Sequence, residues 1–351
     1  MIKNISGIQQ IGVGVTNVYE AWKFYRLAFG ADIPVLDDNS VARLMLPYTG
    51  GQPQERHAVL AINIQGGGGF EIWQYTGRTP AFPSFSILPG DLGINIAKVK
   101  CSNADDAFRV FAGKGIRTND KVYSDDPGRA FFYCTDPWGN IFQVIEDTYC
   151  FKNTGFPTGG IIGAIIGVSD AERSLRFYSG VLGYDQVLYD KTGCFEDLDY
   201  PANGKNSYRR VLLKHTEERK GTFSRLFGPS QIELIQVLDR EPRQIFKDRY
   251  WGDPGFIHLC FDVYDMPAVI NYCNNNGHKV TVDSSADFEM GEAAGHFVYI
   301  EDPDGTLIEF VETFKIPVIK KIGWFLSLKK RDHEKPLPDW MLKALSFNRV
   351  K

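Results

Sequence analysis

An internal repeat restricts the folds open to this chain of 351 residues. Residues 22–32 read WKFYRLAFGAD and residues 175–185 read LRFYSGVLGYD, so both segments place a Gly at the same distance after a Phe-Tyr pair. Residues 132–143 read FYCTDPWGNIFQ and residues 298–309 read VYIEDPDGTLIE, with Asp-Pro-x-Gly between two apolar runs. Such self-similarity indicates that one supersecondary unit is used several times.

The repeated segments lie among runs with strand or helix periodicity. The Phe-Tyr segment reads as a helix between strands, and the Asp-Pro-x-Gly segment as a hairpin, because Pro fixes φ and Gly supplies a positive φ. We therefore expect four modules, each a strand, a helix and three further strands (βαβββ), at 8–76, 92–147, 161–239 and 256–313. The first two would form a domain at 1–150 and the last two a domain at 161–313, with 151–160 as a linker.

Composition is that of a folded protein: 43% of the residues are hydrophobic and 23% are charged. The formal charge of −4 gives no reason to expect a nucleic-acid partner. No apolar run approaches the roughly 20 residues that cross a bilayer, the start lacks the apolar stretch of a signal peptide, and the six cysteines form no CxxC. We expect a cytoplasmic protein without disulfides or membrane contact, either a monomer or a homodimer.

Four βαβββ modules with FYxxxxG helices and DPxG turns resemble the vicinal-oxygen-chelate superfamily. That superfamily includes glyoxalase I, methylmalonyl-CoA epimerase, extradiol dioxygenases and bleomycin-resistance proteins. The resemblance extends over about residues 8–313 and rests on the ordered recurrence of both motifs. It implies an α+β, glyoxalase-like fold in which paired modules form two curved-sheet cups.

The resemblance also implies that each module offers up to two metal ligands. The first-strand positions are Gln10, Asn95, Gly163 and His258, and the last-strand positions are Glu71, Gln143, Glu233 and Glu309. Side chains on one face of neighbouring strands can converge on one ion, and carboxylate, imidazole and amide groups are suitable ligands. We therefore expect a divalent metal ion (Zn, Mn, Ni, Co or Fe) as cofactor.

The pairing of the modules decides which of these residues meet. If the outer modules pair, one site holds Gln10, Glu71, His258 and Glu309, which is the Gln/Glu/His/Glu set of glyoxalase I. The other cup then holds Asn95, Gln143, Gly163 and Glu233 and is expected to be inactive. If sequential modules pair, as in the dioxygenases, Glu233 joins His258 and Glu309 instead. We favour outer pairing because it gives one complete site and one empty cup.

For the outer-paired site, the resemblance implies proton removal next to a metal-bound carbonyl of a small oxygenated substrate, through an enediolate. Glu309 would be the base, with Glu71 on the other face. We therefore expect an isomerase, an epimerase or a lyase. Gly14 and Tyr75 stand where glyoxalase I has glutathione-contacting residues, so glutathione thioesters are not the expected substrates.

Two alternative functions stay open at this point. A ring-cleaving dioxygenase usually needs two histidines and a carboxylate, but only His258 falls on a ligand position, while His296 is expected at the surface or in contact with substrate. A non-catalytic drug-binding protein of the bleomycin-resistance type would need only an aromatic-lined cup, and the chain contains six Trp, 16 Tyr and 25 Phe.

The residues after the repeat, 314–351, form a basic extension that we call the tail. Residues 315–351 contain ten Lys and Arg against three Asp and Glu, and PDWMLKALSF at 338–347 predicts an amphipathic helix. The favoured interpretation is a solvated extension whose Trp and Leu residues pack on the neighbouring sheet. The alternative is a lid over the cup or a contact with an anionic surface.

Overall fold

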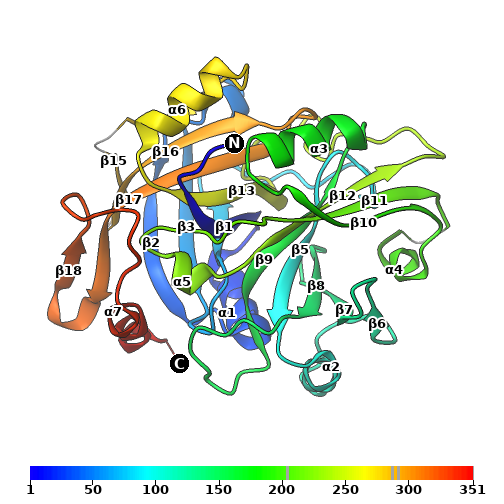
Figure 1. Ribbon diagram of the computed structural model, residues 1–351, viewed down its shortest axis with the longest axis horizontal. Helices are drawn as coiled ribbons and strands as arrows, with labels where there is room; N and C mark the ends of the chain where they lie inside the picture. The colour runs from blue at the N-terminus through cyan, green and yellow to red at the C-terminus, as the bar shows by residue number, and fades with distance from the viewer. Residues whose placement is uncertain (203–204, 286–287, 291–292, 351) are drawn as a thin grey trace.

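Two curved sheets make up most of the computed structural model, which describes residues 1–350 except 203–204, 286–287 and 291–292 (Figure 1). The ten-stranded sheet has the order β14-β16-β17-β13-β1-β4-β3-β2, with β15 added to β16 and β18 added to β17. The eight-stranded sheet has the order β10-β11-β12-β9-β5-β8-β7-β6. We call them the first and second sheet.

The elements follow the expected order of four βαβββ modules. Module 1 contains β1 (Ile5–Gly14), α1 (Val18–Phe29), β2 (Ile33–Ala42), β3 (Gln54–Ile62) and β4 (Gly69–Tyr75). Module 2 contains β5 (Gly93–Cys101), α2 (Ala104–Gly113), β6 (Tyr123–Ser124), β7 (Ala130–Thr135) and β8 (Ile141–Glu146). Module 3 contains β9 (Thr158–Gly167), α3 (Ala171–Gly180), β10 (Gln186–Gly193), β11 (Tyr208–Lys214) and β12 (Gln231–Val237). Module 4 contains β13 (Gly255–Val263), α6 (Met266–Asn275), β14 (Val282–Asp283), β15 (Phe288–Met290), β16 (Ala293–Glu301) and β17 (Leu307–Ile319).

Further short elements lie between the modules' strands or in the tail. Two short helices, α4 (Asp199–Ala202) and α5 (Ser224–Phe227), lie in module 3, and the tail adds β18 (Trp324–Ser327) and α7 (Asp339–Ala344). Single 3-10 turns occur at Leu46–Tyr48, Glu196–Leu198, Lys320–Ile322 and Leu345–Asn348. Among the described residues, no helix combines the length and the hydrophobicity needed to span a membrane.

The outer modules pair with each other, and so do the inner modules. Strand β1 is antiparallel to β13, which builds the first sheet from modules 1 and 4, and β5 is antiparallel to β9, which builds the second sheet from modules 2 and 3. The preferred pairing is thus confirmed and sequential pairing is wrong. Residues 1–150 and 161–313 do not each form a sheet of their own. The first strands β9 and β13 are buried along their whole length and carry apolar residues on both faces, so their pattern is compatible with either partner.

The two sequence motifs meet within each half of the chain. The Tyr25 hydroxyl on α1 donates to Asp136 Oδ2 (2.7 Å) in the turn of module 2, and the Tyr178 hydroxyl on α3 donates to Asp302 Oδ2 (2.9 Å) in the turn of module 4. In both turns the same carboxylate also accepts bonds from backbone N–H groups. The FYxxxxG helix of one module is therefore tied to the DPxG turn of the next, while their strands belong to different sheets.

The boundaries of the linker and the tail differ from those expected. The last residues of the expected linker belong to β9, which begins at Thr158, and β17 extends to Ile319, beyond the expected end of module 4. The predicted tail helix is present as α7. The tail packs on the first sheet through a cluster that includes Ile316, Leu342 and Leu345, which agrees with the packed interpretation of its apolar residues.

Candidate metal centre

Four predicted residues lie on four consecutive strands of the first sheet: Gln10 on β1, Glu71 on β4, His258 on β13 and Glu309 on β17. The strand register brings them together in two neighbouring rows. Gly12 is paired with both Glu71 and His258, and Cys260 is paired with both Gln10 and Glu309. We call these four residues the metal centre.

The side chains of the metal centre are buried and close together. His258 Nε2 lies 3.1 Å from Glu71 Oε2 and 3.2 Å from Glu309 Oε2, and Gln10 Nε2 donates to Glu71 Oε2 over 3.1 Å. His258 is fully buried, and the other three residues are each at most 6% exposed. One atom from each of Glu71, His258 and Glu309 lies within 4.8 Å of the others.

Several polar atoms of the metal centre have no hydrogen-bond partner among the described residues. These atoms are Gln10 Oε1, His258 Nε2 and Glu309 Oε2. His258 Nε2 is near two carboxylates but directs an aligned hydrogen bond at neither. A buried polar atom without a partner costs about 1–3 kcal/mol, and a divalent ion would satisfy a nitrogen and oxygens grouped in this way. The residues therefore fit a divalent metal ion.

Tyr299 on β16 adds an orienting contact behind the histidine. Its hydroxyl oxygen lies 3.4 Å from His258 Nδ1, and Tyr299 is 2% exposed. A partner at one ring nitrogen fixes the imidazole so that the other nitrogen faces an ion. Tyr299 was missed by the sequence analysis, although it lies three residues before the Asp of the DPDG turn, just as Tyr133 precedes the DPWG turn.

The glutamate and the histidine influence each other's protonation. Burial raises the pKa of Glu309 to about 7, against the lowering effect of His258 and with a further rise from Glu71. Burial acts to lower the pKa of His258, but the charges of Glu309 and Glu71 outweigh it and the pKa lies above its usual value.

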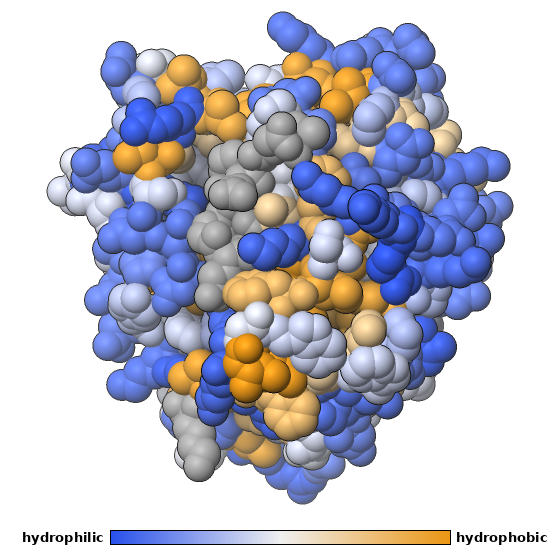
Figure 2. All heavy atoms as spheres, turned by 90° about the vertical axis from the view of Figure 1, so that its left-hand side faces the viewer, coloured by the Kyte–Doolittle hydropathy of each residue, from blue (hydrophilic) through white to orange (hydrophobic). Residues whose placement is uncertain are grey.

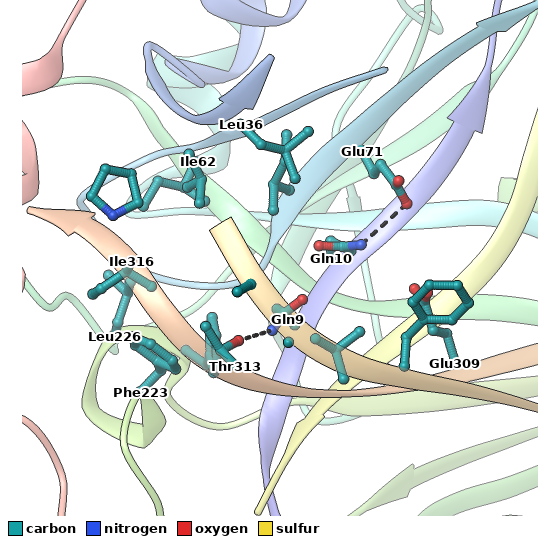
Figure 3. A pocket seen from close by; sticks show the side chains of 18 of the residues that line it. Gln9, Gln10, Leu36, Ile62, Glu71, Phe223, Leu226, Glu309, Thr313 and Ile316 are labelled. Atoms are coloured by element: carbon teal, nitrogen blue, oxygen red, sulfur yellow. Dashed lines mark hydrogen bonds between the residues drawn. The ribbon is translucent and has the colours of Figure 1, made fainter. Parts of the chain in front are cut away.

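A β-bulge in β1 brings an additional polar residue to the centre. The register between β1 and β13 shifts between Ile8 and Gln10, so Gln9 is an extra residue and lines the same pocket as Gln10 (Figure 3). Gln9 Nε2 donates to Asp262 Oδ1 (3.2 Å) and to Thr313 Oγ1 (3.3 Å).

A pocket of about 130 Å³ opens above the metal centre and is lined by Gln10, Glu71 and Glu309. Its remaining lining is mostly apolar. It includes Leu36 and Ile62 of module 1, Phe223 and Leu226 near α5, and Ile316 of β17 (Figure 3). Apolar residues also gather on the side of the molecule that carries β2, β17 and β18 (Figure 2).

His296, expected at the surface or in contact with substrate, lies on β16 and lines this pocket. His296 Nε2 lies 2.7 Å from Asp283 Oδ1, so the imidazole is held by a carboxylate outside the metal centre. Its role in substrate binding stays a prediction.

The corresponding place in the second sheet is occupied by an ammonium group. Glu233 on β12 is fully buried and contacts Lys98 Nζ (2.5 Å), Arg210 (2.6 Å) and the Tyr189 hydroxyl (2.7 Å). Burial acts to raise the pKa of Glu233, but Arg210 and Lys98 outweigh it and lower the pKa to about 2. Glu233 is therefore committed to internal cations and does not join His258, as sequential pairing would have required.

The register also identifies what replaces the other ligands. Lys98 is paired with both Gly163 and Gln143, so Lys98 holds the position that Cys260 has in the first sheet. Ile96 is paired with Ile165, so Ile96 holds the position that His258 has in the first sheet. The assignment of Asn95 to a ligand position is wrong by one residue. Asn95 sits at a bulge in β5, where its amide bonds the backbone of Gly90 and Asp91.

Side chains fill the concave face of the second sheet. A buried apolar cluster there includes Ile96, Tyr133, Ile165 and Leu198, the last from the segment before α4. Neither Gly163 nor Ile96 carries a ligand atom. Among the described residues, the second sheet therefore lacks the donor set of the first.

Comparison with known proteins places this architecture among related folds. Residues 164–299 match the family model described as "Glyoxalase/Bleomycin resistance protein/Dioxygenase superfamily". Glyoxalase I from Zea mays is similar in structure, with a TM-score of 0.53 at 15% identity over 87% of this chain and 92% of that chain. A putative dioxygenase from Bacillus subtilis gives a TM-score of 0.55 at 14% identity over 89% of this chain and 86% of that one. No curated protein matches the sequence. The expected fold of four modules in two curved sheets is confirmed.

Proposed function

We propose that this chain is a metal-dependent isomerase, epimerase or lyase of the glyoxalase, bleomycin-resistance and dioxygenase superfamily, and that it removes a proton next to a carbonyl group. The observation that carries the proposal is the metal centre itself. Two carboxylates, an imidazole and an amide from four adjacent strands meet in a buried place, and three of their polar atoms have no hydrogen-bond partner in the described part of the chain.

Gln10, Glu71, His258 and Glu309 would hold the ion in this proposal. A divalent ion bound there would polarise a substrate carbonyl oxygen and so acidify the neighbouring C–H group. Glu309 Oε2 lines the pocket without a hydrogen bond of its own, so it is placed to accept that proton and return it. Glu71 lies on the other side of His258 Nε2, and Tyr299 holds the imidazole in place.

The donor set supports this reaction over ring cleavage with oxygen. Non-haem iron sites of that type usually combine two histidines with one carboxylate. Among the described residues His258 is the only histidine at the centre, because His296 is bound to Asp283. The similarity to both a glyoxalase I and a putative dioxygenase leaves either chemistry open at the level of the fold.

The donor set also argues against a purely passive binding cup. Burying ionisable groups without compensation is costly, and an apolar replacement of similar size is often neutral or stabilising. A protein that only sequesters an apolar molecule would have no use for Glu71, His258 and Glu309 at the floor of its pocket.

Metal content and proton exchange test the proposal together. The purified protein is loaded with Zn²⁺, Mn²⁺, Ni²⁺, Co²⁺ or Fe²⁺, and the bound metal is measured by mass spectrometry. Exchange of the α-protons of an α-hydroxyketone with D₂O is then followed by NMR. We expect one ion per chain and metal-dependent exchange in the wild type, and loss of both in Glu71→Ala, which removes the ligand atom.

Gln143→Leu is the matched control, because Gln143 is the counterpart of Glu309 in the second sheet, where no ion is expected. It should retain metal and exchange. Glu309→Gln should slow exchange by far more than it lowers metal content, since the amide can still act as a ligand but not as a base. Exchange at the wild-type rate in metal-loaded Glu309→Gln would contradict the assignment of the base.

A further inference from the structure

The pocket at the metal centre has one polar end and one apolar end. Gln10, Glu71 and Glu309 lie at the polar end, and Gln9 and Thr313 lie between them and the apolar end (Figure 3). Apart from His296, the rest of the lining is aliphatic or aromatic or glycine, and it comes from β2, β3, α5, β16, β17 and the tail. Any molecule whose carbonyl reaches the metal centre must place its remaining atoms against this apolar surface.

Among the described residues that line the pocket, none is a lysine or an arginine. Substrates with phosphate or carboxylate groups are normally held by such cations, through charge-assisted hydrogen bonds. The bound ion would neutralise Glu71 and Glu309, and the imidazole of His296 is engaged by Asp283, so no free cation remains among the described lining residues to hold an anionic group. The lining therefore selects against anionic substrates such as nucleotide or coenzyme thioesters.

One side of the apolar wall is built by segments that lie outside the four-module repeat. Phe223, Leu226 and Phe227 come from α5 and the residue before it, a feature of module 3 alone. Ile316, Pro317 and Leu345 come from the end of β17 and the tail. All but Pro317 belong to one buried cluster, which also contains Ile62, Leu337 and Leu342. The tail is thus a structural wall of the pocket.

The space enclosed is about 130 Å³. A dry protein cavity of about 150 Å³ lined by Leu, Ile and Phe binds benzene. The apolar end thus has room for a group the size of one aromatic ring or a short branched alkyl chain.

We infer that the substrate is a neutral carbonyl compound with one apolar group of about the size of a benzene ring, and that Leu345 and the α5 aromatics determine this preference. The inference rests on the proposed function, because it assumes that this pocket receives the reacting molecule. It goes further in naming the charge and the size of that molecule and the residues that select it.

Three related α-hydroxyketones serve as probes. They are 2-hydroxyacetophenone (neutral, one ring), 4-(hydroxyacetyl)benzoate (the same ring with a carboxylate) and hydroxyacetone (no ring). Binding to the metal-loaded full-length protein is measured by titration calorimetry. Because burial of one aromatic ring is worth about 1.5–3 kcal/mol, the neutral aromatic ketone should bind about 10- to 100-fold more tightly than hydroxyacetone. Its affinity should exceed that of 4-(hydroxyacetyl)benzoate by at least the same factor.

Two apolar residues near the end of the tail provide a pair of variants. Leu345 is buried and lines the pocket, whereas Phe347 is 63% exposed and does not line it. Leu345→Ala should weaken binding of 2-hydroxyacetophenone about tenfold and leave hydroxyacetone unchanged, whereas Phe347→Ala should leave both unchanged. Leu345→Phe keeps the tail packed and fills the pocket, so it should also weaken binding of the aromatic ketone. This variant takes the place of Leu345→Ala if Leu345→Ala does not fold.

Equal or tighter binding of the carboxylate would overturn the inference. So would unchanged affinity for 2-hydroxyacetophenone in folded Leu345→Phe. Failure of the proposed function is recognised separately, by D₂O exchange on the same samples. Selective binding without exchange supports the pocket assignment and contradicts the catalytic one. Exchange with a preference for the anionic ketone supports the catalytic assignment and contradicts the pocket assignment.

Discussion

Lys98 Nζ lies 2.5 Å from Glu233 Oε2, so the second sheet holds an ammonium group with the glutamate that corresponds to Glu71 of the metal centre. Both side chains are at most 1% exposed. The second sheet thus neutralises its carboxylate with a residue of the chain itself. In the first sheet, we propose, the carboxylates are neutralised by a bound metal ion instead.

Lys98→Met should destabilise the protein by about 3–5 kcal/mol, because it leaves Glu233 buried with one cation fewer. Urea denaturation of the wild type and the variant measures the free energy of unfolding. Adding Glu233→Gln to Lys98→Met should restore part of the loss. A double variant less stable than Lys98→Met would show that Arg210 alone suffices for Glu233.

Tyr299→Phe should weaken metal binding by about 10- to 100-fold, which is the usual effect of removing a group that orients a metal-binding histidine. Competition with a chelator of known affinity measures the change. Tyr133→Phe is the control, because Tyr133 holds the same place before the turn in the second sheet, where its hydroxyl donates to Asp197. Equal affinities of the wild type and Tyr299→Phe would remove Tyr299 from the metal centre.

Stability should fall as the pH rises from about 4 to 7, through Asp262. Burial raises the pKa of this carboxyl from 3.8 to about 7, so in that range the folded protein retains a proton that the unfolded chain has lost. One proton held only by the folded state lowers the free energy of unfolding by about 1.4 kcal/mol for each pH unit.

Asp262→Asn keeps an oxygen that accepts from Gln9 and removes the titration. Its free energy of unfolding, measured in urea at pH 4, 5.5 and 7, should decline less with pH than that of the wild type. Parallel pH profiles for the two proteins would assign the decline to other groups.

Two apolar residues near the end of the chain should differ sharply in their effect on stability. Leu342 is fully buried in the tail cluster and Phe347 is 63% exposed. Leu342→Ala should cost about 2–5 kcal/mol, the range for core Leu→Ala changes, while Phe347→Ala should stay within about 0.5 kcal/mol. Thermal denaturation followed by circular dichroism separates them. A neutral Leu342→Ala would mean that the tail is not part of the folded core.

The repeat made the module fold predictable, because FYxxxxG and DPxG each demand a specific local structure. The structure adds that Tyr25 and Tyr178 bind the Asp of the following turn, a contact that the shared motifs could have suggested. Module pairing was less accessible, since a strand such as β13, apolar on both faces, accepts either neighbour. The favoured outer pairing rested on the chemistry of the ligands rather than on strand pattern.

The incorrect residues have separate causes. The assumed alignment of module 2 with module 4 was off by one residue, which moved the assignment from Ile96 to Asn95. Lys98 was overlooked because lysine is almost never fully buried unless it is paired. The part of the pocket wall that contains Phe223, Leu226 and Leu345 belongs to segments that do not repeat, so comparison of the modules could not reveal it.

The antiparallel pairing of β1 with β13 has a consequence for biosynthesis. The residues of the metal centre extend from residue 10 to residue 309, so a nascent chain cannot assemble it until module 4 has been translated. Modules 2 and 3 can form their sheet earlier, whereas β1 cannot pair with β13 until the chain about 250 residues downstream has been made. A ribosome that stops after module 3 would release a chain with one finished sheet and without His258 and Glu309 of the metal centre.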